Sequence, residues 1–331
     1  MRCCVLSLPL LISLVIVSTV FGPDILPQLV TPILSYIPPF QTPSQPFDQA
    51  IPLRRTLITA DFEAFEESCS LLEALSLDDE DVRLSLARGM AFPDEHGGVR
   101  CLANILDFID RGDYHPLWSD LPGDTAQRER SFDFCKAALI KAVVEVAGEE
   151  KNVDVLWDDS NPEQPGGALI AQMVQWIKTH KDLKDRNRND LLVCATLTLG
   201  NLLRHGAFNS LSFRRNVNLI YFVIAGAQSV TLVGPPISLA PDLAALLRPE
   251  TDIKVKHGVI GLLKHLAYAA PARASLGEAG IVKRLVDSKI FQPAADMAEM
   301  VQVNAIGVTK HLCSGNCEFQ KPSLSSHVPK D

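Results

Sequence analysis

The sequence predicts an all-α protein, an armadillo- or HEAT-type α-solenoid built from stacked helical units. The twelve residues from Val255 to Leu266 recur from Val301 to Leu312, 46 positions later, with six identities. Apolar residues in both segments follow a period of 3.6, which places them along one buried face of a helix. Self-similarity at a period of about 40 to 47 residues is typical of armadillo and HEAT arrays, which bind macromolecules along an extended concave surface.

A third copy of the pattern lies upstream, from Leu191 to Leu202, and a fainter fourth copy runs from Cys135 to Val146. Aligning the first three copies brings their apolar positions into one register: Leu191, Val255 and Val301; Ala195, Val259 and Ala305; Leu199, Leu263 and Thr309; Leu202, Leu266 and Leu312. We therefore expect helices near 190–204, 252–268 and 299–313, stacked with these stripes inward.

The segments between the copies also fit helical units. Asp252 stands where an N-cap residue should begin the following helix. A glycine-containing turn precedes an apolar helix at 281–286, and a second helix is expected at 168–179. The run at 219–225, which is rich in β-branched and aromatic residues, instead predicts a strand-like segment.

Composition divides the chain into five parts. We expect a signal-like or anchor-like hydrophobic segment at 1–22, for which a mispredicted first exon is the alternative, and a linker with eight prolines at 23–54. The helical array covers 55–316, with an irregular insertion at about 206–237, and a disordered tail follows at 317–331. The last copy lacks a capping helix, so the array is expected to be incomplete.

The net charge of −8 argues against general nucleic-acid binding, which needs a basic face. Nine acidic residues and no basic ones lie between Asp61 and Asp81, and the densest patch is Asp78, Asp79, Glu80 and Asp81. This patch either attracts a basic peptide or forms a solvated helix face. Without glycosylation sequons or a disulfide-type cysteine spacing, the expected location is the cytoplasm; a genuine leader would instead give an endomembrane or secreted protein.

No motif for catalysis or phosphate binding is present, so we expect a binding protein without catalytic residues, cofactor or metal. Asn201, His265 and His311 occupy one register position. In armadillo units, which the pattern resembles, that position faces the concave groove and is usually Asn. The three residues are therefore candidates for a partner-binding ladder, and inter-repeat hydrogen bonding is the alternative role.

The run at 190–202, the segment at 252–258 and the Lys-His-Leu motifs ending at Leu266 and Leu312 resemble the small-GTPase GDP-dissociation stimulator family, its fungal members in particular. The resemblance covers roughly residues 55–205 and 236–316. It implies an armadillo array that binds Rho- and Rap-type GTPases with basic, prenylatable C-terminal tails. It also implies guanine-nucleotide exchange or escort of the GTPase, through differential binding to the nucleotide-free state.

Two alternatives stay open at this level. One is another armadillo scaffold or cargo adaptor that binds a basic peptide. Nuclear-import adaptors place Trp one turn before the groove Asn, whereas this sequence has Leu197, Gly261 and Gly307 there. The other is an exported protein of unknown activity, which depends on the hydrophobic leader alone.

Overall fold

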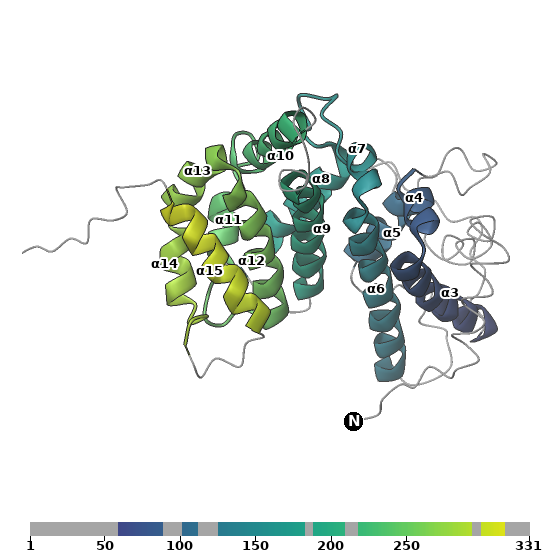
Figure 1. Cartoon of the computed structure of the whole chain (residues 1–331). Helices are drawn as coiled ribbons and strands as arrows, with labels where there is room; N and C mark the ends of the chain where they lie inside the picture. The colour runs from purple at the N-terminus through teal and green to yellow at the C-terminus, as the bar shows by residue number, and fades with distance from the viewer. Residues whose placement is uncertain are drawn as a thin grey trace, which may run out of the picture. The chain divides into compact units, whose positions relative to one another are not determined.

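The computed structural model describes residues 59–88, 101–111, 125–182, 188–208, 218–292 and 299–314. Every regular element in these ranges is a helix, and no strand occurs among them, which confirms the all-α class (Figure 1). No helix in these ranges is long and apolar enough to cross a membrane. The expected leader at 1–22, linker at 23–54 and tail at 317–331 lie outside the described residues.

The chain forms two compact units, Met1–Ala171 and Gln172–Asp331. The described helices of the first unit are α3 (Thr59–Asp78), α4 (Glu80–Arg88), α5 (Cys101–Arg111), α6 (Thr125–Gly148), η5 (Glu150–Asn152) and α7 (Val153–Leu156). Helix α8 (Gly167–His180) includes the boundary between the units and confirms the helix expected at 168–179.

The core of the first unit forms around α6, a helix of 24 residues that packs against α3, α4 and α5. The faint fourth copy of the repeat lies on α6. Its apolar positions are all buried: Cys135, Leu139, Ala142, Val143 and Val146. This burial confirms that the stripe recognised in the sequence is the face on which α6 packs.

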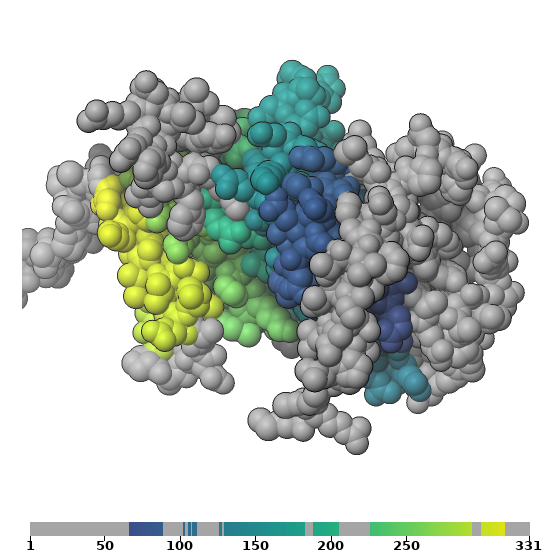
Figure 2. Space-filling view, turned by 45° about the vertical axis from the view of Figure 1, so that its right-hand side comes forward, coloured from purple at the N-terminus to yellow at the C-terminus, as the bar shows by residue number. Residues whose placement is uncertain are grey.

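The second unit contains the three clear copies of the repeat. Its elements are α9 (Asn189–Phe208), α10 (Asn218–Val233), α11 (Ala240–Ala245), α12 (Ile253–Tyr268), η7 (Ala270–Ala272), α13 (Arg273–Glu278), α14 (Ile281–Asp287) and α15 (Glu299–Cys313). Helix α12 packs against α9 on one side and α15 on the other, as Figure 1 shows. Much of the surface of α15 is in view, in yellow, in Figure 2.

The predicted register of these three helices is confirmed by burial. The apolar positions of the stripe are at most 3% exposed: Leu191, Ala195, Leu199 and Leu202 on α9; Val255, Val259, Leu263 and Leu266 on α12; Val301, Ala305 and Leu312 on α15. Thr309, the one polar member of the stripe, is half-buried and donates a hydrogen bond from Oγ1 to the carbonyl oxygen of Ala305 at 3.0 Å.

Small residues allow α9 and α12 to approach closely. A Cβ added at Gly258 would lie 2.1 Å from Oγ1 of Thr196 on α9. That hydroxyl is itself held by a hydrogen bond of 2.7 Å to the carbonyl oxygen of Leu192. On the facing side, a Cβ at Gly200 would lie 3.7 Å from Cα of Leu262, an ordinary contact. The two helices can therefore lie this close only because Gly258 has no side chain.

Two helix starts follow the sequence prediction, and one segment does not. Asp252 caps α12, because its Oδ1 accepts a hydrogen bond of 2.8 Å from the N–H of Lys254. Gly280, with a left-handed φ of 71°, precedes α14. The strand-like interpretation of 219–225 is wrong, since these residues belong to α10, which packs against α9 and η7. Tertiary packing there overrides a local preference for strand.

Candidate interaction surfaces

The three ladder residues lie on consecutive helices of the second unit. Asn201 is on α9, His265 on α12 and His311 on α15, each one residue before the last buried position of its stripe. All three are half-buried, whereas the neighbouring Leu202 and Leu266 are buried. Since α12 packs against both α9 and α15, the predicted ladder follows three adjacent helices.

The ring of His311 contacts an aromatic ring at the end of α12. Its imidazole lies 4.3 Å from the ring of Tyr268, at the end of α12, with an angle of 42° between the planes. Burial, and then the positive charges of Arg273, Lys310 and Lys264, lower the pKa of His311 below its ordinary value of 6.5. His311 is therefore a neutral group at physiological pH, able to donate and accept one hydrogen bond each.

Two of these cations, Arg273 and Lys264, also form hydrogen bonds between neighbouring helical elements. Nε of Arg273 donates to the carbonyl oxygen of Ala267 at 2.8 Å, and Nη2 donates to that of Tyr268 at 3.2 Å, which satisfies the end of α12. Nζ of Lys264 donates to Oδ1 of Asn304 at 2.9 Å and links α12 to α15. This end of the ladder is positively charged, so it suits carbonyl or carboxylate oxygens better than a lysine-rich tail.

The positions one turn before the ladder carry no indole. Leu197, Gly261 and Gly307 are half-buried, and a Cβ at Gly261 would meet nothing within 4 Å. Trp157 and Trp176 are buried, while Trp118 lies outside the described residues. The described ladder surface therefore offers no tryptophan on which the side chain of a bound lysine could stack.

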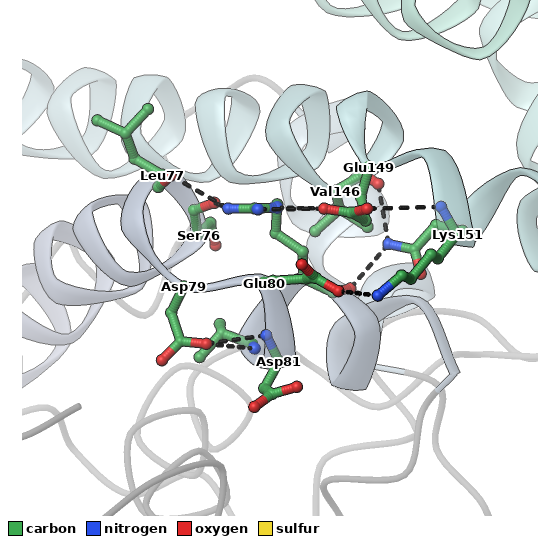
Figure 3. Close-up of polar contacts among 11 residues, drawn as sticks. Ser76, Leu77, Asp79, Glu80, Asp81, Val146, Glu149 and Lys151 are labelled. Carbon is green, nitrogen blue, oxygen red and sulfur yellow. Dashed lines mark hydrogen bonds and ion pairs between the residues drawn. The ribbon is translucent and has the colours of Figure 1, made fainter. Parts of the chain in front are cut away.

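In the first unit, two of the four residues of the acidic patch stabilise the fold. Oδ1 of Asp79 accepts hydrogen bonds from the N–H groups of Asp81 at 2.8 Å and Val82 at 3.3 Å, and so caps α4 (Figure 3). Glu80 forms an ion pair with Lys151, whose hydrogen bond and charge lower the pKa of the Glu80 carboxyl. Asp78 and Asp81 are exposed and remain available to a partner.

Arg83 of α4, which belongs to no motif of the sequence, links α3 and α4 to the residue that follows α6. Nε and Nη2 of Arg83 each lie 3.1 Å from Oε2 of Glu149, and Nη1 donates to the carbonyl oxygens of Ser76 at 3.0 Å and Leu77 at 3.1 Å. The buried Asn152 donates from Nδ2 to the carbonyl oxygen of Arg83 at 3.0 Å. Figure 3 shows this contact region. The only sequence signal is that Arg83 is the first basic residue after the acidic run.

Three of the described cysteines have the properties of packing residues, whereas Cys313 is half-buried. Cys69, Cys135 and Cys194 are free and buried. Burial raises the pKa of Cys194 to about 12 and that of Cys69 well above its usual range, which disfavours the reactive thiolate. Among the described residues, no three His, Cys, Asp or Glu side chains gather to hold a metal ion.

Comparison of the chain with protein families, with curated proteins and with solved structures finds no match. The likeness to the GDP-dissociation stimulator family thus depends on the motifs in the sequence.

Proposed function

We propose that this protein is an armadillo-type α-solenoid that binds a Rho- or Rap-type small GTPase and acts as its exchange factor or escort. The observation that carries the proposal is the ladder of half-exposed polar residues at one register position of α9, α12 and α15. Resemblance to the stimulator family supplies the identity of the partner. The proposal places the protein in the cytoplasm, where small GTPases act.

The armadillo arrangement is supported by the way the three helices repeat their contacts. Each carries the same buried stripe, and α12 packs against both α9 and α15. Gly258 of α12 lies close to Thr196 of α9. Lys264 of α12 donates a hydrogen bond to Asn304 of α15. Repetition of one helix-to-helix contact is what generates a solenoid with a continuous side surface.

The ladder chemistry suits a partner's main chain. The amide of Asn201 can donate and accept, and His311 does the same in its neutral form. The positive charges of Lys264, Arg273 and Lys310 near His311 favour an acidic or carbonyl-rich part of the GTPase domain. A basic tail of the GTPase would instead contact exposed acidic residues such as Asp78 and Asp81.

Exchange would follow from differential binding. If the ladder contacts the nucleotide-free conformation of the GTPase more tightly than the GDP-bound one, mass action shifts the GTPase toward release of GDP. No bond is made or broken by this protein in such a mechanism. In this proposal the protein acts through an interaction surface, and its sequence contains no catalytic motif.

The proposal can be tested by measuring the release of a fluorescent GDP analogue from a panel of Rho, Rap and Ras proteins. Replacing Asn201, His265 and His311 together by alanine should lower both affinity and release rate by about tenfold to a hundredfold at every salt concentration. The matched control is Asp78→Asn with Asp81→Asn, which leaves the Asp79 cap intact. This control should lower only the association rate and its salt dependence.

Two results would contradict the proposal. If the alanine triple variant retained its helical content and released GDP like the parent, the ladder would be structural only. If an isolated lysine-rich peptide bound as tightly as any GTPase of the panel, the protein would be a peptide adaptor of the same fold. A calorimetric titration with the tail peptide and with a tail-less GTPase domain separates these cases.

A further inference from the structure

Helix α15 is apolar on two opposite faces. Its inner face, Val301, Ala305, Val308 and Leu312, is buried, and the helix packs against α12, α13 and α14. On the outer face, the side chains of Val303 and Ile306 are 51% and 57% exposed, respectively. Val303 and Ile306 lie one turn apart, so the outer face carries a pair of neighbouring exposed aliphatic side chains.

The corresponding side of α12, 46 residues earlier in the chain, consists of Ile253, His257, Ile260 and Lys264. Ile260, which is 46 residues before Ile306 and shares its register, is fully buried. Lys264, the counterpart of Lys310, extends to Asn304 of α15. On α12 this side is covered only in part, since Ile253 and His257, the counterparts of Glu299 and Val303, are exposed. On α15 it stays open in the part of the chain that the structure describes.

We propose that this outer face of α15 binds the same face of a second copy of the chain, with the two helices antiparallel. At about 100° per residue, Glu299, Val303, Ile306 and Lys310 lie within about 60° of arc on one side of the helix. Their order is symmetric: an acidic residue, two aliphatic residues and a basic residue, centred between positions 304 and 305. The face is thus complementary to itself.

A two-fold axis through that centre pairs each residue with its complement. Val303 contacts the partner's Ile306, and Glu299 forms an ion pair with the partner's Lys310. Because the axis repeats each contact, the dimer has two aliphatic contacts and two ion pairs, as an isologous interface requires. Glu299 and Lys310 are both exposed, so neither has to leave a buried site to make these contacts.

The dimer should be weak. Helix α15 has 15 residues and is therefore about 22 Å long, which gives an interface at or below the lower limit of specific protein contacts. We expect a dissociation constant on the order of 10 µM, in which case dimers form only at high local concentration. This inference does not depend on the proposed GTPase function: the two surfaces share Lys310, but Val303 and Ile306 lie on a different side of α15 from His311.

Sedimentation velocity of the full chain over a range of concentrations tests the proposal, with helical content checked by circular dichroism. Ile306→Lys should weaken the dimer by about a hundredfold, because the isoleucine is lost at two symmetric sites. Glu299→Lys and Lys310→Glu should each weaken it severalfold, since each creates two like-charge contacts. Combining the two charge reversals should restore the affinity of the parent.

Leu77→Lys is the control, because Leu77 is a similarly exposed aliphatic residue of the first unit; it should leave the dimer unchanged. The proposal is overturned if the parent is monomeric at all concentrations or if Ile306→Lys dimerises like the parent. Failure of the double charge reversal to restore dimerisation would exclude the antiparallel two-fold pairing.

Discussion

The close approach of α9 and α12 leads to opposite predictions for two glycines on one helix. Gly258→Ala places a methyl group 2.1 Å from Oγ1 of Thr196, far inside contact distance. Gly261→Ala, one turn further along α12, places the same methyl group where no atom lies within 4 Å. Both changes raise the helix propensity of α12 equally, so the difference between them isolates the contact with α9.

The magnitudes follow from this comparison. Alanine is about 1 kcal/mol more favourable than glycine in a helix interior, so Gly261→Ala should stabilise the protein by up to that amount. At Gly258 the gain is opposed by overpacking, which costs about 1–3 kcal/mol. Thr196 cannot move away freely, because turning its hydroxyl breaks the 2.7 Å hydrogen bond to the carbonyl oxygen of Leu192. Gly258→Ala should therefore be about 1–3 kcal/mol less stable than Gly261→Ala.

Urea titrations followed by far-ultraviolet circular dichroism measure both variants against the parent. The variant Thr196→Ala removes Oγ1 and leaves only Cβ, which is 3.1 Å from the added methyl group. In that background Gly258→Ala should lose much of its penalty, giving a coupling of about 1 kcal/mol. Equal stabilisation by Gly258→Ala and Gly261→Ala would refute the helix packing described here.

Three further predictions concern packing, capping and titration. Val259→Asp should abolish folding of the second unit, because an unpaired charge in the seam between helices costs several kcal/mol; a urea titration measures the loss, and Val155→Asp at an exposed position is the control. Asp79→Ala should destabilise the first unit by about 0.5–2 kcal/mol through loss of the α4 cap, whereas Asp79→Asn retains an acceptor and most of the stability in the same assay. His311→Phe keeps a ring against Tyr268 but removes a titrating group, so urea midpoints between pH 7 and pH 5 should fall less for this variant than for the parent.

The sign of the titration effect follows from the lowered pKa of His311. The unfolded chain takes up its proton near pH 6.5, before the folded protein does, so stability falls as the pH drops from about 6.5 through the folded pKa. Identical pH profiles for parent and variant would show that His311 titrates alike in both states. An unchanged urea midpoint for Val259→Asp would contradict the register, and equal loss from Asp79→Ala and Asp79→Asn would contradict the cap.

Much of the second unit could be predicted because its information is local and repeated. The apolar stripe of α12 and α15 specifies which side of each helix is buried, and Asp252 marks the start of α12. The segment 219–225 does not follow its local pattern. There, β-branched and aromatic residues favour a strand locally, and packing of α10 against α9 and η7 determined a helix instead.

The candidate sites were predicted only in part. Asn201, His265 and His311 share one register position in the sequence, and adjacent packing of α9, α12 and α15 brings that position onto neighbouring helices. Lys310 is next to His311 in the sequence, but nothing there indicated that the charges of Lys264 on α12 and Arg273 at the start of α13 also act on His311. The charge of a site sums over elements that are distant along the chain.

By itself, the sequence determined the helical class, the buried side of each repeated helix and the residues that share a register, because each of these follows from spacing within one helix. Tertiary structure decided which acidic residues stay available. Glu80 pairs with Lys151 and Arg83 with Glu149, over separations of 71 and 66 residues, so their charges are engaged within the fold. Such pairings depend on where helices meet in space, which no local pattern specifies.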